Sequence, residues 1–489
     1  MRQSIIYTSE NKNCYLYNDK HRFSMIVHPA LKQICETEKC DYVDSYYVRK
    51  YMYLKKHDFF SNMDYIDINT EISEAKVKEA LSHTPQILFE VTESCNLNCV
   101  YCALGSVYEW GKNRKGKKLD INSALSLLRY IWGLKLSNKD TELVISFYGG
   151  EPLLNIKFIK TIVDFVCNLN HAGVVNVSYS MTTNAVLLDK YIDYLVANRF
   201  HILVSLDGNE ENNSYRIYQK NGRNSFRKIV ENLDFVKEKF PNFFETNVDF
   251  NAVLHNRNSV KSIYEFFHGR YHKIPRVSEM NRGGIVEEKN DLFQKMFRDI
   301  RDSEKEYYKE KDNLLLHEDL LPFHELSNFL KYFSINSYVS DILSTLCVEN
   351  KYFPASTCFP FSKKIFLTTH GQLMPCERID YKYSLGEVDE GVFLNVSQIV
   401  QQYNAYYKCL EKYCRHCYLY RFCGLCMFHL ENLKKEGTEK MVCHYFHNQK
   451  KFQFKLSRIF SFLEKHPNDF FKILEAVSYT HLTLPTILR

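Results

Sequence analysis

Between residues 85 and about 275, short apolar runs with strand character alternate with longer runs of helical periodicity. This alternation is typical of βαβ units, which assemble a parallel sheet. Active sites of such sheets lie at the carboxyl ends of the strands. The sequence therefore predicts an α/β fold whose functional residues directly follow strands. We expect strands over residues 86–91, 143–148, 175–181, 201–206 and 248–254, and helices over 121–136, 156–170 and 226–239.

Three cysteines, Cys95, Cys99 and Cys102, follow the first expected strand within eight residues. Thiolates at this spacing can hold three irons of a 4Fe–4S cubane and leave the fourth iron free for another ligand. A purely structural cluster would use four thiolates, so the missing ligand indicates catalysis, as an open position does in zinc enzymes. Spacing alone leaves a zinc site or buried thiols as the alternative.

Polar turns follow the next expected strands in the same way. Two adjacent glycines let the backbone approach a ligand closely, and Glu151 offers a carboxylate for an ammonium group. Any one of these turns alone would be an ordinary strand-to-helix connection. Several in order at strand ends favour one common site. The residues concerned are Gly149, Gly150, Glu151, Pro152, Thr183, Asn184, Ser205, Asp207 and Arg216.

Eight further cysteines lie between residues 358 and 443, and seven of them, all except Cys409, have motif-like spacing. Two Cys-x-x-Cys pairs in isolation would indicate a zinc ribbon. Seven thiols are too many for one tetrahedral zinc, and their spread suits two iron–sulfur clusters. These cysteines are Cys358, Cys376, Cys414, Cys417, Cys423, Cys426 and Cys443.

Composition limits the function classes. The net charge of +6 over 489 residues is mild and no long Lys/Arg run occurs, so a nucleic-acid enzyme is not expected. The N-terminal residues become polar too early for a secretory signal, and no stretch approaches the roughly 20 apolar residues of a membrane span. We therefore expect a cytoplasmic protein. In a reducing compartment, 16 cysteines indicate metal rather than disulfides.

The Cys95–Cys102 spacing with Tyr101 before the last cysteine, together with the Gly-Gly-Glu-Pro turn, resembles the radical S-adenosylmethionine (SAM) superfamily. This resemblance implies a partial (β/α)6 TIM-like barrel in which the amino and carboxylate groups of SAM chelate the fourth iron. It implies that the Gly-Gly-Glu-Pro turn binds the methionine amino group. Contacts to the ribose and the methionine carboxylate would come from the other strand-end residues, Thr183, Asn184, Ser205, Asp207 and Arg216.

The C-terminal cysteines resemble the SPASM domain, which follows radical enzymes that modify peptides and proteins. The spacing departs from the usual pattern, because two residues rather than three separate Cys423 and Cys426. The resemblance implies two auxiliary clusters, the second of which has either Cys347 as a further ligand or an open iron. The implied ligand sets are Cys414, Cys417, Cys423 and Cys443 for one cluster, and Cys358, Cys376 and Cys426 for the other.

Glu377 directly follows Cys376. In relatives that act on sulfatases, an acid at this place takes a proton from the substrate radical intermediate. The alternative is a solvated glutamate or an ion pair with Arg378. Glu377 is therefore the candidate catalytic base.

The domain boundaries follow from these patterns. Residues 1–84 form a small α/β domain with strands over 5–8, 13–17 and 23–27 and a helix over 29–38, similar in outline to leader-peptide-binding domains. The radical SAM barrel then covers 85–290, a helical bridge 291–345 and the SPASM region 346–476. Residues 477–489 look like a translated sequencing adapter and are set aside.

The resemblance implies reductive cleavage of SAM to a 5′-deoxyadenosyl radical, with ferredoxin or flavodoxin as a suitable electron donor. We expect a maturase that crosslinks a ribosomally made peptide. The alternatives are an anaerobic sulfatase-maturating enzyme, which makes formylglycine, and a non-catalytic iron–sulfur electron carrier. The three-thiolate site argues against the carrier, since a carrier needs no open iron.

Overall fold

A computed structural model of the chain gives the fold. It describes residues 4–19, 22–37, 39, 43–57, 59–60, 66, 68–112, 114–138, 142–300, 302–303, 306, 321–334, 353–430, 433 and 443–467. Cys347 and the adapter-like residues 477–489 lie outside the described residues, as does most of the expected bridge 291–345.

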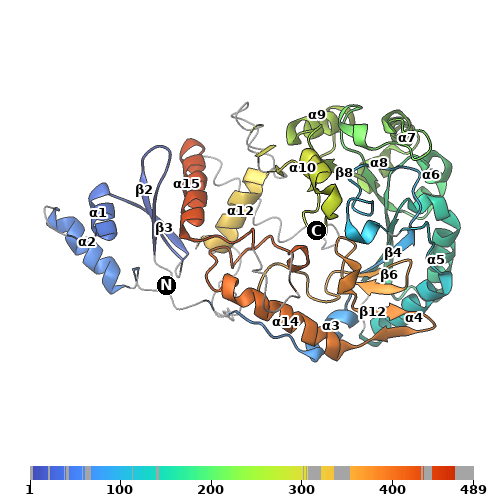
Figure 1. The fold of residues 1–489 in the computed structure, drawn as a ribbon, viewed down its shortest axis with the longest axis horizontal. Helices are drawn as coiled ribbons and strands as arrows, with labels where there is room; N and C mark the ends of the chain where they lie inside the picture. The colour runs from blue at the N-terminus through green and yellow to red at the C-terminus, as the bar shows by residue number, and fades with distance from the viewer. Residues whose placement is uncertain are drawn as a thin grey trace.

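Six parallel strands, adjacent in chain order, form the centre of the molecule and confirm the partial (β/α)6 barrel (Figure 1). The five expected strands are present, and the expected helices among them are present too. A sixth strand, β9, was missed because its four residues are mostly polar. The strands are β4 (Gln86–Thr92), β5 (Glu142–Gly149), β6 (Asn176–Thr183), β7 (His201–Ser205), β8 (Val248–Leu254) and β9 (Arg276–Glu279).

Helices connect successive strands and pack outside the sheet (Figure 1). Their apolar faces bury residues at helical spacing, such as Ile159, Ile162 and Val166 in α5. Burial of each such side chain contributes about 1.5–3 kcal/mol. The helices are α4 (Ile121–Asn138), α5 (Ile156–Leu169), α6 (Leu188–Ala197), α7 (Phe226–Lys239), α8 (Pro241–Asn247), α9 (Val260–Tyr271) and α10 (Asn290–Met296).

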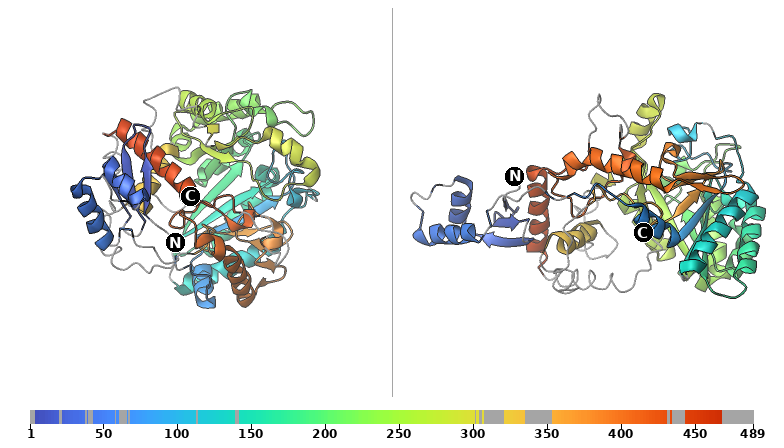
Figure 2. Two further views of the ribbon diagram at one scale, coloured as in Figure 1. Left: turned by 60° about the vertical axis from the view of Figure 1, so that its left-hand side comes forward. Right: turned by 90° about the horizontal axis from the view of Figure 1, so that it is seen from below.

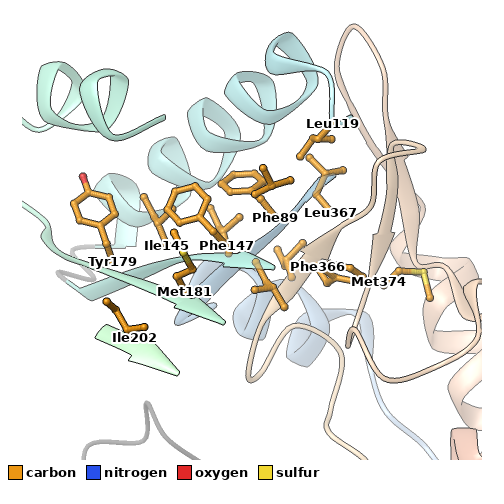
Figure 3. Close-up of a cluster of buried hydrophobic side chains, with 14 of the residues drawn as sticks. Phe89, Leu119, Ile145, Phe147, Tyr179, Met181, Ile202, Phe366, Leu367 and Met374 are labelled. Atoms are coloured by element: carbon orange, nitrogen blue, oxygen red, sulfur yellow. The ribbon is translucent and has the colours of Figure 1, made fainter. Parts of the chain in front are cut away.

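The C-terminal region continues the same sheet. Strand β10 (Ile365–Leu367) pairs in parallel with β4, and β11 (Gln372–Met374), β12 (Gly386–Val388) and β13 (Val392–Leu394) extend it antiparallel. Figure 3 shows Phe366 and Leu367 beside Phe89 in one buried cluster. The cysteine-rich region is therefore joined to the barrel through backbone hydrogen bonds and a shared core.

The N-terminal strands β1 (Ile5–Thr8), β2 (Cys14–Asn18) and β3 (Phe23–Val27) form a separate antiparallel sheet. Alternate residues face opposite sides, as the two-residue period of a strand requires. One side packs on α1 (Pro29–Thr37) and α2 (Ser45–Lys56), and the other on α12 (Leu321–Phe333) and α15 (Gln449–Lys465). Figure 2 shows this unit at one end of the elongated molecule and the barrel at the other.

Helix α3 (Glu74–Ser82) falls within the expected N-terminal domain of residues 1–84 but packs against α14 (Val396–Cys414) and α4. The Asn404 side chain accepts from Ile72 N at 2.8 Å and donates to Ile72 O at 3.3 Å. The segment before β4 is therefore built into the barrel side of the molecule. Among the described helices, none is both long and apolar enough to span a bilayer.

Candidate functional site

The three clustered cysteines lie on the loop that leaves β4. Burial raises the pKa of the Cys95 and Cys99 thiols to about 12, and the neighbouring thiols add to the shift. Metal ligation requires the thiolate form, so iron would displace these protons. In the described part of the chain, no three Cys, His, Asp or Glu side chains converge tightly enough to bind a single metal ion. Three soft sulfur donors on one buried loop fit the ligand set of an iron–sulfur cluster.

The two glycines at the end of β5 touch the cysteine loop. Gly150 N donates to Thr92 O at 2.7 Å, and Glu151 N donates to Ser94 O at 2.9 Å. A Cβ on Gly150 would lie 2.1 Å from Ser94 O, and Gly149 has a φ of +122°. The two glycines therefore let the end of β5 approach closely the backbone that carries Cys95.

Glu151 joins the ends of β5 and β6. Its fully buried carboxylate accepts from Thr183 Oγ1 at 2.7 Å, Asn184 N at 2.8 Å and Leu153 N at 3.2 Å. Burial raises the pKa of Glu151 to about 7 although these hydrogen bonds favour the anion. Pro152 follows as the first residue of a short 3₁₀ helix. The binding of an ammonium group by Glu151 stays a prediction, because its oxygens already have protein donors.

Asn184 contacts the cysteine loop directly. Its Nδ2 donates to Asn96 Oδ1 at 2.7 Å and lies 3.7 Å from Cys95 Sγ. The β6 end is thereby held against the same loop as the β5 end. Ser205, which ends β7, pairs with Asn251 of β8 and is half-buried.

Asp207, Arg216 and Tyr101 form a buried group beside Cys99. Tyr101 Oη donates to Asp207, and Arg216 Nε lies 3.2 Å from the Asp207 carboxylate. Arg216 Nη1 is 3.8 Å from Cys99 Sγ. Although burial opposes the charge of Asp207, the Arg216 guanidinium lowers the pKa of that carboxyl. The structure therefore brings three expected site residues together around one sulfur.

Sequence reasoning missed His255, which directly follows β8. The imidazole is fully buried, faces Asp207 Oδ2 at 3.6 Å and stacks on the Tyr101 ring at 5.5 Å. A histidine gives no motif by itself. Its position at the carboxyl end of an expected strand was the available signal.

Two buried glutamates, also missed, hold the C-terminal region against the start of the cysteine loop. Glu93 accepts from Lys115 N at 2.9 Å, Lys117 N at 3.0 Å and His370 Nε2 at 2.9 Å. Glu90 accepts from Thr369 N at 3.0 Å. The turn between β10 and β11 therefore braces the segment that leads to Cys95.

Four C-terminal cysteines line one pocket, and they are the set expected for the first auxiliary cluster: Cys414, Cys417, Cys423 and Cys443. Burial raises the pKa of Cys414 to about 12 and that of Cys423 to about 11, with a further contribution from the neighbouring thiols. Four convergent thiols fit a fully ligated cluster.

The second expected set is less compact. Burial raises the pKa of Cys426, and the neighbouring Cys358 adds to the shift. Burial likewise raises the pKa of Tyr403, to which both of these cysteines contribute. The charged neighbours of Cys376 are instead Glu377, Lys364 and Arg378.

Burial raises the pKa of the Tyr148 phenol in β5, and the nearby Glu377, Cys102 and Cys376 add to the shift. Lys364 Nζ is 3.2 Å from the Glu377 carboxylate, and Arg378 Nε is 3.7 Å away. Burial would raise the pKa of Glu377, but these two cations lower it to about 2. Glu377 is thus a paired anion and a weak base in this arrangement.

The model of the Radical SAM superfamily matches residues 89–267, the span of β4 through most of α9. Residues 89–267 therefore form a radical SAM domain. A radical SAM domain implies a 4Fe–4S cluster and SAM, and the three-thiol loop held against the ends of β5 and β6 fits both.

Two curated relatives are, by their names, a cyclopropyl synthase and a sulfatase-maturating enzyme. The radical SAM cyclopropyl synthase TigE of Paramaledivibacter caminithermalis is 26% identical over 214 residues, which cover 42% of each chain. The cysteine-type anaerobic sulfatase-maturating enzyme of Clostridium novyi is 26% identical over 325 residues, 62% of this chain and 76% of that enzyme. The chain therefore spans less than half of the length of TigE.

A solved structure, native anSMEcpe with bound AdoMet and the Kp18Cys peptide, has the same fold. The alignment covers 81% of this radical SAM chain and 99% of that chain, with a TM-score of 0.51 and 16% identity. At this identity the likeness concerns the fold alone.

Proposed function

We propose that this radical SAM protein is a peptide maturase that installs a crosslink in a ribosomally made precursor. The observation that carries the proposal is the three-thiol loop held by the ends of β5 and β6, in a chain that also has a C-terminal pocket of four cysteines. The name of the Clostridium novyi relative, a sulfatase-maturating enzyme, supports a protein or peptide substrate. The 16 cysteines also favour a reducing compartment, the cytoplasm. The proposed electron donor is a ferredoxin or flavodoxin.

In this proposal Cys95, Cys99 and Cys102 hold three irons of the catalytic cluster. When bound, the cluster and SAM supply a 5′-deoxyadenosyl radical that abstracts hydrogen from an unactivated carbon. The chain's own part is to fix the loop: Gly150 holds its backbone, and Asn184 holds the Asn96 side chain. The cysteine pocket around Cys414 would hold one auxiliary cluster, and Cys358, Cys376 and Cys426 would contribute to a second.

The N-terminal sheet is the proposed binding site for the precursor's leader segment. Strand β3 is an edge strand of this sheet, and Ile26 on it is 62% exposed. An exposed edge can accept an extended peptide as an additional strand. Helix α2 offers exposed basic side chains at Arg49, Lys55 and Lys56 and contains no acidic residue, which suits an acidic leader.

Co-expression with a small open reading frame from the same gene neighbourhood tests this function. Mass spectrometry should show a precursor lighter by two hydrogens. Ile26→Asp should weaken leader binding at least tenfold, whereas Val174→Asp, which changes another exposed β-branched residue outside the N-terminal sheet, should not. An unmodified precursor, together with conversion of a sulfatase-derived cysteine peptide to formylglycine, would refute the proposal.

The sulfatase-maturating alternative is favoured by the 76% coverage of the Clostridium novyi enzyme. It requires an acid near Cys376 to accept a proton. The pKa of about 2 given to Glu377 by Lys364 and Arg378 makes that carboxylate a weak acceptor. The crosslinking reading therefore remains our proposal.

A further inference from the structure

Buried side chains around Asp207 form a series of contacts that runs from His255, just after β8, through Asp207 and Arg216 to Cys99. We propose that His255 is a positioning residue: its Nε2–H fixes Asp207, which aims the Arg216 guanidinium at the Cys99 sulfur and so raises the reduction potential of the cluster bound there. This inference rests on the proposed function, since it concerns the cluster that the cysteine loop would hold.

Hydrogen bonding decides the tautomer of His255. Arg257 N donates to His255 Nδ1 at 3.1 Å, so Nδ1 carries no proton and the ring proton of the neutral imidazole lies on Nε2. Asn258 Nδ2, 3.3 Å from Nε2, already directs its hydrogens to Val253 O at 2.9 Å and Asp207 O at 3.4 Å. The Nε2–H therefore faces Asp207 Oδ2, which lies 3.6 Å away, in an electrostatic contact.

Asp207 is surrounded by donors. Besides His255, its carboxylate receives Val253 N at 3.0 Å and the Tyr101 hydroxyl, and it is fully buried. These contacts fix the anion against which the Arg216 side chain is placed.

Arg216 is the last residue in this series of contacts before Cys99. Its side chain is 8% exposed, its Nε lies 3.2 Å from Asp207 Oδ2 and its Nη1 is 3.8 Å from Cys99 Sγ. A cation and an N–H donor beside a ligating thiolate stabilise the additional electron of a reduced cluster, and hydrogen bonds to the sulfurs are among the factors that set such potentials. Arg216 thus tunes the cluster, and His255 acts through Asp207 on Arg216.

A pair of variants separates this role from simple packing. In His255→Gln the amide nitrogen can replace the Nε2 donor, whereas in His255→Asn the amide oxygen replaces the Nδ1 acceptor and the donor to Asp207 is lost. The readout is the midpoint potential of the EPR signal that changes on SAM addition, measured in the full-length holoprotein. His268→Asn on the exposed face of α9 is the matched control.

We expect His255→Asn to shift this potential to more negative values, while His255→Gln and the control stay near wild type. If the asparagine variant misfolds, Tyr101→Phe, which removes the hydroxyl donor to the same Asp207 oxygen, should give the same shift. Equal potentials in all variants, or a shift in the glutamine variant alone, would overturn the assignment. A wild-type protein without any SAM-sensitive signal would refute the proposed function itself.

Discussion

Replacing Gly150 with alanine should disrupt the catalytic loop without touching any cysteine. The added methyl carbon would lie 2.1 Å from Ser94 O and 2.7 Å from Glu93 O, both backbone atoms that cannot rotate away. The end of β5 and the cysteine loop must then separate by about 1.3 Å, the difference between 2.1 Å and an ordinary contact of 3.4 Å.

This separation breaks the hydrogen bonds Gly150 N to Thr92 O and Glu151 N to Ser94 O. Their loss should cost about 2 kcal/mol of unfolding free energy, at roughly 1 kcal/mol each. A displacement of about 1 Å at a reaction centre can lower the rate about 100-fold. We therefore expect Gly150→Ala to bind iron but to form 5′-deoxyadenosine about 100 times more slowly.

The assay is anaerobic reduction with SAM present, with 5′-deoxyadenosine quantified by chromatography and iron and melting temperature measured on the same samples. Gly133→Ala is the matched control, because Gly133 lies exposed in α4 with no atom within 4 Å of the added Cβ. Removing a helical glycine should stabilise that variant by about 0.5–1 kcal/mol. Wild-type rates and stability in Gly150→Ala would refute the reasoning.

Three further predictions concern charge and clusters. Burial raises the pKa of Glu151 from 4.5 to about 7, so the folded chain retains a proton that the unfolded chain releases. The free energy of unfolding should therefore fall by about 3 kcal/mol between pH 4.5 and 7. Denaturant titrations should show that Glu151→Gln flattens this pH dependence. Glu377→Gln leaves Lys364 and Arg378 without their shared anion and should cost about 2 kcal/mol at pH 7; an unchanged melting curve would show that the ion pairs contribute nothing. Joint replacement of Cys417 and Cys443 by alanine should remove about four irons per chain, whereas Cys167→Ala, at an exposed position, should remove none.

The barrel could be predicted from sequence because its signals are local. Strand β8 was expected at its observed bounds, Val248–Leu254, since apolar residues alternate there and turn residues flank it. The sheet extension could not be predicted in this way: β10 has three residues, and its pairing with β4 joins segments that are far apart in the chain.

The same distinction holds for the site. Cysteine spacing identified the Cys95 loop, because ligands of one cluster recur at short intervals. The set of Cys414, Cys417, Cys423 and Cys443, which lines one pocket, came from the resemblance to the SPASM domain. His255, Glu90 and Glu93 carry no spacing signal, and only the fold reveals their contacts. The paired state of Glu377 with Lys364 likewise depends on β10 and β11 lying side by side.

The most direct test of the account compares the wild-type protein with a variant in which Cys95, Cys99 and Cys102 are all alanine. After anaerobic reconstitution and reduction with SAM, the wild type should hold about twelve irons and release 5′-deoxyadenosine and methionine in equal amounts. The variant should lose about four irons and form neither product. Product formation by the variant, or its absence from fully loaded wild-type protein, would contradict the claim that an open iron on this loop cleaves SAM.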